Sequence, residues 1–318
     1  MILITGSTGY IGSHISQYFD QRKINYIGID NNTYSNRTNV QKKESHHKID
    51  INEIKKIDKL VDKYKINTII HAAASSYVLE GEINKKKYFL NNVIKTKKFI
   101  NFCKNKKIDN FIFLSSSNVY KELKSHQKLS ENSKLLSKNY YGKTKVLIEN
   151  YLKKKKFKKL VILRLFNIIG IHNKNFKYFN FKNNIYQRLV FQVQDKIKKN
   201  KFLKIRYSIK NNKKLFPSRD FIDVKIICYT IHKIIKNLNI DKSKKIILNI
   251  GSGISTPIDQ LIEKIKKNSN KKLMLKYEKI NKKELMSTKA NVSKLKKFLK
   301  KNYSFNLNKS IKSHFVKI

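Results

Sequence analysis

Short apolar runs alternate with longer amphipathic stretches through the first half of the chain. Residues 1–5, 67–71 and 110–114 are largely apolar, which is typical of strands buried on both faces of a sheet. Between them lie stretches expected to be helical, including residues 53–64 and one long helix over residues 82–105. Strands that alternate with helices predict an α/β fold built on a doubly wound parallel sheet.

The first strand runs directly into a glycine-rich turn, Gly6-Ser-Thr-Gly9-Tyr10-Ile11-Gly12, and then into a helix. Gly6 permits a tight turn, Gly9 lets the backbone approach a diphosphate, and Gly12 lets the helix lie against the sheet. The helix N-terminus offers N–H groups and a partial positive charge to the same diphosphate. The turn therefore predicts a Rossmann-type dinucleotide site, with a chance glycine turn as the alternative.

A second strand over residues 23–30 ends in Asp30, about twenty residues after the glycine turn. A carboxylate there can accept hydrogen bonds from both hydroxyls of an adenosine ribose, and it would repel the 2′-phosphate of NADP. The predicted cofactor is therefore NAD. A further short strand is expected to end at Asp50-Ile51, and the small residues Ala72 and Ala73 after residue 71 leave room for a cofactor.

Tyr141 and Lys145 are four residues apart at the start of a predicted helix, so they share one face. A phenol must lose about 3 pKa units, or ~4 kcal/mol, to serve as a general base near pH 7. One ammonium at about 5 Å supplies roughly 3 kcal/mol of this at an effective dielectric near 20. Such pairs also arise by chance, but this one follows a strand that ends in serines, which favours a catalytic role.

The chain is strongly cationic, with 72 Lys and Arg against 21 Asp and Glu and a net charge of +51. This balance is typical of proteins that bind nucleic acid or anionic membranes. The excess is nearly all lysine and is spread from Lys23 to Lys317, without clustered arginine among stacking aromatic residues. We interpret it as a compositional bias and predict no nucleic-acid partner.

The two cysteines, Cys103 and Cys228, fall in apolar helical stretches without a neighbouring metal-ligand pattern. Buried reduced thiols are typical of proteins in the cytoplasm. The first strand begins at Met1, which leaves no room for a signal peptide, and no apolar run is long enough to cross a bilayer. The sequence thus predicts a cytoplasmic protein with no metal and no membrane partner.

Over nearly its whole length the chain resembles the extended short-chain dehydrogenase/reductase family of NAD-dependent epimerases and dehydratases, and most of all the nucleotide-sugar 4-epimerases within it. The residues that carry the resemblance are Thr5 to Gly12, Asp30-Asn31, Asp50-Ile51, His71-Ala-Ala, Asn91-Asn92-Val93, Ser115-Ser116-Ser117, Tyr141-Gly-Lys-Thr-Lys145 with Glu149, Leu163 to His172, Asn183-Asn184, Ser218-Arg219-Asp220 and Leu248 to Gly253. Arg-x-Phe-Asn-x-x-Gly-x-His, from Arg164 to His172, is the part most like the 4-epimerases.

The resemblance implies that Ser116 and Tyr141 act at the sugar 4-hydroxyl and that Lys145 tunes the tyrosine. Ser116 is chosen among the three serines because it lies three residues before Val119. The next two positions are Asp-Glu in sugar 4,6-dehydratases, where they remove water, but they are Ser117-Asn118 here. Dehydration is therefore disfavoured.

The resemblance also assigns binding residues. Those implied to contact NAD, besides the three catalytic residues, are Gly6, Gly9, Tyr10, Ile11, Gly12, Asp30, Asn31, Asp50, Ile51, Ala72, Ala73, Asn91 and Phe166. Those implied to hold the nucleotide sugar, besides Ser116 and Tyr141, are Asn167, Asn184, Ile205, Arg219, Lys282 and Thr288. Lys282 stands in for a phosphate-binding arginine that this chain lacks, and Lys95 occupies a position usually held by glycine. For Arg164 we expect a structural role.

Thr288 aligns with a bulky tyrosine that crowds the sugar 2-position in some members, so an N-acetyl group would fit here. The implied activity is interconversion of UDP-glucose and UDP-galactose, or of the N-acetylated pair, through a 4-keto intermediate in a homodimer. Another nucleotide-sugar enzyme of the family (a UDP-glucuronate 4-epimerase, a reductase or a dehydratase), a non-catalytic dinucleotide-binding protein and a polyanion binder remain as alternatives.

The expected division of the chain follows the same resemblance. Residues 1–170 form the NAD-binding Rossmann domain, with a returning segment at about 221–251. Residues 171–220 and 252–318 form a smaller nucleotide-sugar-binding subdomain.

Overall fold

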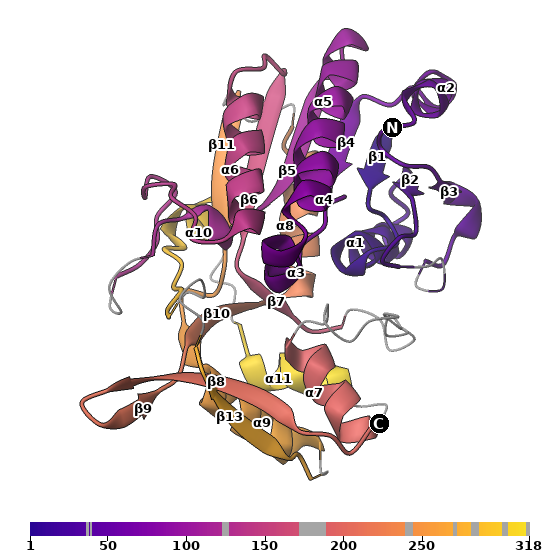
Figure 1. Cartoon of the computed structure of the whole chain (residues 1–318). Helices are drawn as coiled ribbons and strands as arrows, with labels where there is room; N and C mark the ends of the chain where they lie inside the picture. The colour runs from indigo at the N-terminus through magenta and orange to yellow at the C-terminus, as the bar shows by residue number, and fades with distance from the viewer. Residues whose placement is uncertain are drawn as a thin grey trace.

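The chain folds into a large lobe with a central sheet and a smaller lobe beneath it (Figure 1). The computed structural model describes residues 1–35, 38, 40–122, 127–171, 189–238, 244–269, 272–280, 286–300 and 305–315. In the described parts, no helix combines the length and the apolar character that a bilayer crossing demands.

Seven parallel strands form the central sheet in the order β11-β6-β5-β4-β1-β2-β3, which confirms the predicted doubly wound parallel sheet. The strands are β1 (Ile2–Thr5), β2 (Tyr26–Asp30), β3 (His46–Lys48), β4 (Thr68–His71), β5 (Asn110–Ser116), β6 (Lys159–Leu165) and β11 (Lys245–Ile250). The strand order reverses between β1 and β4, and ligands of such sheets bind at the carboxyl ends beside the reversal. β3 ends two residues before Asp50, earlier than expected.

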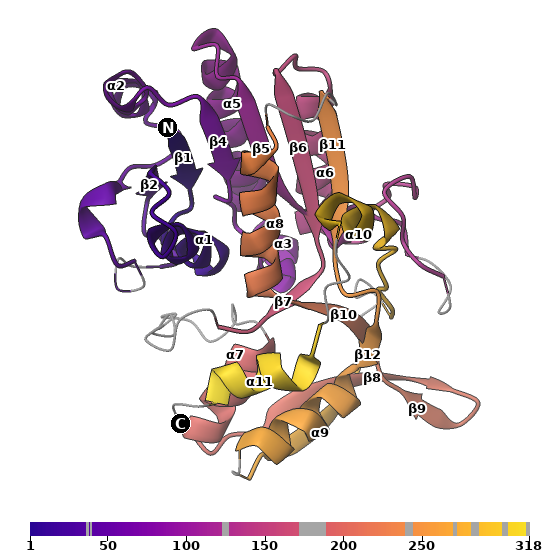
Figure 2. The same cartoon turned by 180° about the vertical axis from the view of Figure 1, so that it is seen from behind.

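Helices cover both faces of this sheet, as a comparison of the two views shows (Figures 1 and 2). One face carries α2 (Ile54–Tyr64), α5 (Thr96–Asn105) and α6 (Tyr140–Lys153), and the other carries α1 (Tyr10–Asp20), α8 (Val224–Lys236) and α10 (Ser293–Leu299). In β1, Ile2 and Ile4 join the core beneath α1 and α8, whereas Leu3 joins the core on the opposite face. Burial on both faces explains why the strand is apolar at every one of these positions.

The single long helix expected over residues 82–105 is wrong, because the chain is interrupted twice there. It forms α3 (Val78–Ile83), α4 (Lys85–Phe89), a π-helical turn η3 (Leu90–Lys95) and then α5. The break falls at Asn84, whose backbone angles (φ −108, ψ 53) are not helical. In the π turn, the Asn92 side chain accepts a hydrogen bond from the Ser75 N–H and donates one to the Ser75 carbonyl, both at 2.8 Å. These bonds tie the wide turn to the segment that follows β4.

The described residues of the smaller lobe form two three-stranded sheets and three helices. β7 (Asn167–Ile169), β10 (Ser218–Asp223) and β12 (Ser255–Pro257) form the sheet nearer the large lobe, and β8 (Leu203–Lys210), β9 (Lys213–Leu215) and β13 (Leu275–Lys279) form the outer one. The core of this lobe lies between β8 and the helices α7 (Leu189–Lys198), α9 (Ile258–Ser269) and α11 (Leu307–Phe315).

The chain crosses between the lobes more often than the expected division implies. After β10 the chain returns to the large lobe, to which it contributes α8 and β11. α10 lies within the stretch 252–318, yet Leu295 and Leu299 pack into the core of the large lobe. These residues are four apart and therefore form one apolar helix face.

Candidate active site

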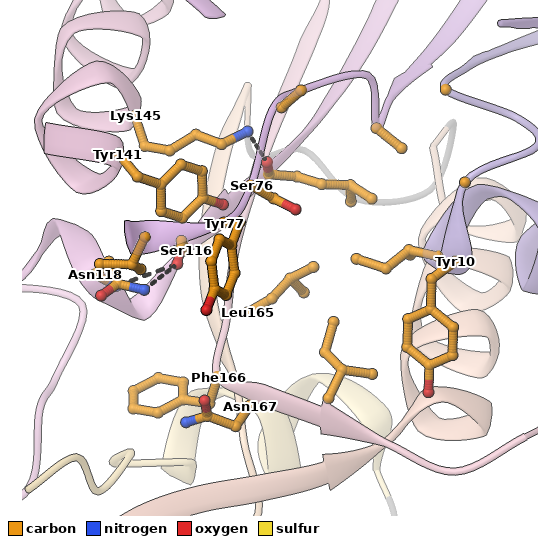
Figure 3. A pocket seen from close by; sticks show the side chains of 18 of the residues that line it. Tyr10, Ser76, Tyr77, Ser116, Asn118, Tyr141, Lys145, Leu165, Phe166 and Asn167 are labelled. Atoms are coloured by element: carbon orange, nitrogen blue, oxygen red, sulfur yellow. Dashed lines mark hydrogen bonds between the residues drawn. The ribbon is translucent and has the colours of Figure 1, made fainter. Parts of the chain in front are cut away.

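A pocket of about 370 Å³ opens at the carboxyl ends of β1, β4, β5 and β6 and extends to α7 and β10 of the smaller lobe. Figure 3 shows side chains from the glycine turn, from the end of β5 and from α6 around one space. The predicted site residues that the pocket brings together are Gly6, Gly9, Tyr10, Ile11, Gly12, Ala72, Ser116, Tyr141, Lys145, Phe166 and Asn167.

The glycine turn leaves open backbone where a diphosphate would lie. Gly6 has a φ of +68°, which disfavours any residue with a side chain. Among the described residues, a Cβ at Gly9 would approach only the Gly6 carbonyl oxygen, at 3.2 Å, so this position is open. A Cβ at Gly12 would lie 2.0 Å from that same oxygen. Gly12 is thus required by the turn itself, rather than by helix–sheet contact as expected.

The carboxylates predicted to hold the adenosine end lie next to this turn. Asp30 accepts hydrogen bonds from the backbone N–H groups of Thr8 (3.1 Å) and Asn32 (2.8 Å), while burial raises the pKa of its carboxyl group. Asp50 accepts from Asn31 Nδ2 at 2.8 Å and pairs with Lys95 at 2.8 Å. The lysine that replaces the usual glycine therefore supplies a partner for Asp50.

Six of the residues predicted to contact NAD lie beyond the walls of the pocket itself: Asp30, Asn31, Asp50, Ile51, Ala73 and Asn91. The Ala73 N–H donates to Thr5 Oγ1 at 3.3 Å, and Asn91 Nδ2 donates to Ser75 Oγ at 3.0 Å. Ile51 is buried in the core beneath α2. The open turn, the adjacent carboxylates and the helix N-terminus fit a dinucleotide.

Lys145 and Tyr141 face one another on α6. Lys145 Nζ donates to the Leu114 carbonyl at 2.9 Å and lies 5.9 Å from the centre of the Tyr141 ring. Burial lowers the pKa of Lys145 to about 7, although the Glu149 carboxylate opposes this shift. The ammonium is therefore close enough to stabilise a Tyr141 phenolate, and a small change in its surroundings alters its charge near neutral pH.

Ser116 stands at the end of β5 and caps the short helix η4 (Ser117–Val119). Its Oγ accepts hydrogen bonds from both the backbone N–H and the side-chain Nδ2 of Asn118, each at 3.2 Å. Figure 3 shows Ser116 and the Tyr141 hydroxyl facing the same part of the pocket.

Two side chains hold the first turn of α6 in place. Asn139 Oδ1 accepts from the Gly142 N–H at 2.8 Å, and Glu82 Oε1 accepts from the Tyr140 N–H at 2.7 Å. A Cβ at Gly142 would lie 2.2 Å from the Asn118 carbonyl oxygen. Glycine therefore lets the helix approach η4 closely enough to bring Tyr141 beside Ser116.

Arg164 has the structural role that we expected. It is 1% exposed, and its Nη2 lies 2.7 Å from Oε2 of the equally buried Glu149 on α6. Ser115 Oγ donates to the other carboxylate oxygen at 2.6 Å. The pair joins β6, β5 and α6 behind the pocket.

The predicted substrate residues are dispersed. Asn167 lines the pocket, whereas Ile205, Arg219 and Thr288 are not among its described walls. Ile205 belongs to the core of the smaller lobe, Arg219 Nη1 donates to the Ser218 carbonyl at 2.9 Å, and Thr288 Oγ1 accepts from the Asp220 N–H at 3.3 Å. Asn184 and Lys282 lie outside the described residues.

The pocket residues that sequence reasoning missed include three with polar side chains from the loop after β2 and from the start of α3: Tyr34, Tyr77 and Glu80. Glu80 is 1% exposed and accepts hydrogen bonds from Tyr34 (3.1 Å), Lys87 (2.9 Å) and Tyr88 (2.9 Å). The sequence offers one signal for Glu80: it is an acidic residue next to apolar positions, in a chain with few acidic residues.

The open glycine turn, the carboxylate after β2 and the Tyr–Lys pair on α6 define the class of dinucleotide-dependent enzymes. The sequence model of the NAD dependent epimerase/dehydratase family matches residues 2–251. The chain belongs to this family.

Curated relatives and solved structures agree with this assignment. The chain is 26% identical over 311 residues to UDP-glucose 4-epimerase of Dictyostelium discoideum, covering 94% of this chain and 90% of that protein. It is 31% identical over 184 residues to the bifunctional protein GAL10 of Kluyveromyces lactis, covering 54% of this chain but only 27% of that longer protein. The structure of UDP-glucose 4-epimerase from Bifidobacterium longum, in complex with NAD+ and UDP, is similar with a TM-score of 0.87 at 20% identity, covering 99% of this chain and 96% of that one.

Proposed function

We propose that this protein is an NAD-dependent nucleotide-sugar 4-epimerase that interconverts UDP-glucose and UDP-galactose. The observation that carries the proposal is the convergence of Ser116, Tyr141 and Lys145 in a pocket that continues to the open glycine turn. UDP-glucose 4-epimerases among the relatives support the choice of reaction. Asn118 further supports it, because an amide cannot act as the acid that dehydration needs.

Bound NAD supplies a hydride acceptor for the sugar C4 and then returns the hydride. Tyr141, as the phenolate, takes the proton of the 4-hydroxyl, and the Lys145 ammonium stabilises its negative charge. Ser116 holds the 4-oxygen. The resulting 4-keto sugar turns about its diphosphate linkage and presents its other face. The residues that we assign to the nucleotide sugar are Asn167, Asn184, Ile205, Arg219, Lys282 and Thr288.

The cofactor residues of the proposal are those of the glycine turn and the strand ends beside it. The N–H groups of α1 face the diphosphate, because the first turn of a helix has no internal acceptors for them. Asp30 holds the adenosine ribose, and Asp50 with Asn31 holds the adenine end. Lys145 binds the nicotinamide ribose as well as tuning Tyr141.

We also propose that the enzyme is a homodimer. Large apolar side chains are exposed along η3 and α6, where Leu90 is 51%, Ile94 is 46% and Leu147 is 44% exposed. These two elements pack against each other, so the exposed side chains lie on neighbouring elements. Covering such a surface with a second copy would remove apolar area from water. The two buried free thiols favour the cytoplasm as the place where the enzyme acts.

The test is to incubate the purified protein, without added NAD, with UDP-galactose and separately with UDP-N-acetylgalactosamine, and to follow the sugar protons by NMR. We expect the gluco epimer of at least the first substrate, formed with NAD that remains bound through purification. Tyr141→Phe should reduce turnover by more than about 10³-fold while NAD stays bound.

The ratio of the two rates decides which sugar is preferred. Thr288→Tyr should suppress only the N-acetylated substrate if Thr288 leaves room for that group. The absence of any product after NAD is supplied would instead favour another nucleotide-sugar substrate or a non-catalytic dinucleotide-binding protein. Steep salt-dependent binding of nucleic acid would favour the polyanion binder.

A further inference from the structure

A one-way chain of hydrogen bonds leads from the backbone of α6 to the Ser116 hydroxyl. The Gly142 N–H donates to Asn139 Oδ1 at 2.8 Å. A backbone N–H can only donate, so this contact fixes which end of the Asn139 amide is the oxygen. Asn139 Nδ2 is therefore available as a donor, and it donates to Asn118 Oδ1 at 2.8 Å.

The same reasoning fixes the orientation of the Asn118 amide. Because its oxygen accepts from Asn139, its Nδ2 donates to Ser116 Oγ at 3.2 Å, and its backbone N–H donates to the same oxygen at 3.2 Å. A serine hydroxyl has two acceptor positions and one proton. Asn118 fills both acceptor positions, so Ser116 has only its proton left to offer.

The Ser116 hydroxyl lies in the wall of the pocket, with Asn118 on one side and Tyr141 facing the same space (Figure 3). Ser116 is 6% exposed and Asn139 is 2% exposed, so water competes little for these bonds. The two N–H donors of Asn118 occupy the lone pairs of Ser116 Oγ. The hydroxyl proton of Ser116 therefore points toward the space where a substrate oxygen would bind.

We infer that Asn118 is a positioning residue that makes Ser116 a hydrogen-bond donor, and never a proton relay, toward the 4-oxygen of the sugar. The inference rests on the proposed epimerase function and deepens it. A relay would require Ser116 to accept the substrate proton while it passes its own to Tyr141. That would break a hydrogen bond from Asn118.

The step balances with Tyr141 alone as the base. The O4–H bond breaks and its proton goes to the Tyr141 phenolate, while the C4–H bond breaks and its hydrogen leaves with the electron pair to NAD. The C4=O4 double bond forms, and Ser116 keeps its proton throughout. Its O–H stabilises the negative charge that develops on O4 during this transfer.

The test is Asn118→Asp, which keeps the shape of the side chain but replaces its donor by an acceptor. The new carboxylate still accepts from Asn139, and it also accepts the Ser116 proton and so turns that proton away from the substrate. We expect kcat to fall by about 10- to 100-fold with KM changed by no more than about twofold. The acid limb of the kcat–pH profile should move to higher pH, because a negative charge now lies beside Tyr141.

Two further variants separate positioning from simple damage. Asn118→Ala keeps the backbone donor and adds no charge, so we expect a smaller loss of about 3- to 10-fold and no shift of the profile. Asn105→Asp, at an exposed position at the end of α5, serves as the matched control and should behave as wild type. An Asn118→Asp enzyme with wild-type kcat and pH profile would overturn the inference, as would an Asn118→Ala enzyme whose profile shifts equally.

A second readout does not depend on turnover. In protein labelled with ¹³C at tyrosine Cζ, the Tyr141 titration should move to higher pH in Asn118→Asp and stay in place in Asn118→Ala. If the wild type epimerises no sugar but the Tyr141 titration moves in Asn118→Asp, the hydrogen-bond chain is supported and the proposed reaction is contradicted. If the wild type epimerises a nucleotide sugar but the Tyr141 titration does not move in Asn118→Asp, only the inference about Asn118 is contradicted. Should Asn118→Asp fail to fold, a shifted profile in Asn139→Asp, which removes the donor to Asn118, supports the inference and an unchanged one overturns it.

Discussion

The Tyr34 hydroxyl donates a hydrogen bond to Glu80 Oε1 at 3.1 Å, and both residues line the pocket. This bond joins the loop after β2 to α3 across the dinucleotide site. The loop is also tied to the glycine turn, because the hydroxyls of Thr8 and Ser35 lie 2.6 Å apart. Two hydrogen bonds thus hold the loop after β2 against α3 and the glycine turn beside the pocket.

Tyr34→Phe removes the hydroxyl and keeps the ring. We expect bound NAD to dissociate about 3- to 10-fold faster, since the loop beside the proposed cofactor site loses one hydrogen bond to a carboxylate. The measurement is the NAD content of purified protein over time in dialysis, with Tyr229→Phe on α8 as the control. Equal retention in Tyr34→Phe and wild type would show that the bond does not govern release.

Lys145→Met should raise the stability of the NAD-free protein at pH 7, although it abolishes turnover. Burial lowers the pKa of Lys145 from 10.5 to about 7, so the unfolded chain binds this proton more tightly than the folded chain. Wild-type stability therefore rises with pH between these two values. We expect the free energy of unfolding of the variant to exceed that of the wild type by about 2–4 kcal/mol near pH 7, and this difference should decrease toward pH 10. Urea denaturation at several pH values measures this difference in stability. A difference that does not depend on pH would contradict the lowered pKa of Lys145.

Glu149→Gln should destabilise the fold strongly. Glu149 is 0% exposed and Arg164 is 1% exposed, and a buried charge that loses its partner costs about 3–5 kcal/mol. The double variant Glu149→Leu/Arg164→Met removes both charges and should recover most of this loss. Chemical denaturation of the wild type, the single variant and the double variant gives the comparison. A double variant less stable than the single one would show that polar contacts to Tyr120 and Ser115 matter more than the charge pair.

Leu147→Glu or Ile94→Glu should convert the proposed dimer into a monomer with its fold intact, because each places a charge in an apolar contact. Light scattering after size-exclusion chromatography reports the mass. Leu136→Glu is a matched control, since Leu136 is also exposed (53%) but lies before α6 rather than on it. A monomeric wild type would contradict the proposed dimer. A dimer that both Leu147→Glu and Ile94→Glu retain would place the subunit contact elsewhere.

The parts of the fold that follow from local chemistry could be predicted. β1 and its turn were recognisable because buried parallel strands are apolar at every position and because Gly6 needs a positive φ. The π turn η3 could not be predicted, because it is tied down by hydrogen bonds between Asn92 and Ser75, 17 residues earlier. The helical periodicity of the sequence does not predict a contact of this kind.

The same limit applies to the site. Tyr141 and Lys145 could be paired from their spacing alone, since a helix brings residues four apart together. In the sequence, Asn118 indicated only that the acid of the dehydratases is missing at this position. Its hydrogen bond to Asn139 depends on the contact between η4 and α6, which the sequence does not predict. Tyr34 and Glu80 come from a loop and a helix 46 residues apart, and nothing in their spacing links them.

The strand order has a consequence for how the protein is made. β6 lies in the interior of the sheet only because β11 pairs along its outer edge, and β11 follows it by about 80 residues. While the chain emerges from the ribosome, one edge of β6 therefore has unpaired backbone N–H and C=O groups, and such edges pair with other chains. Slow synthesis at low temperature, or a chaperone that shields residues 159–165 until residue 250 has emerged, should increase the yield of folded enzyme.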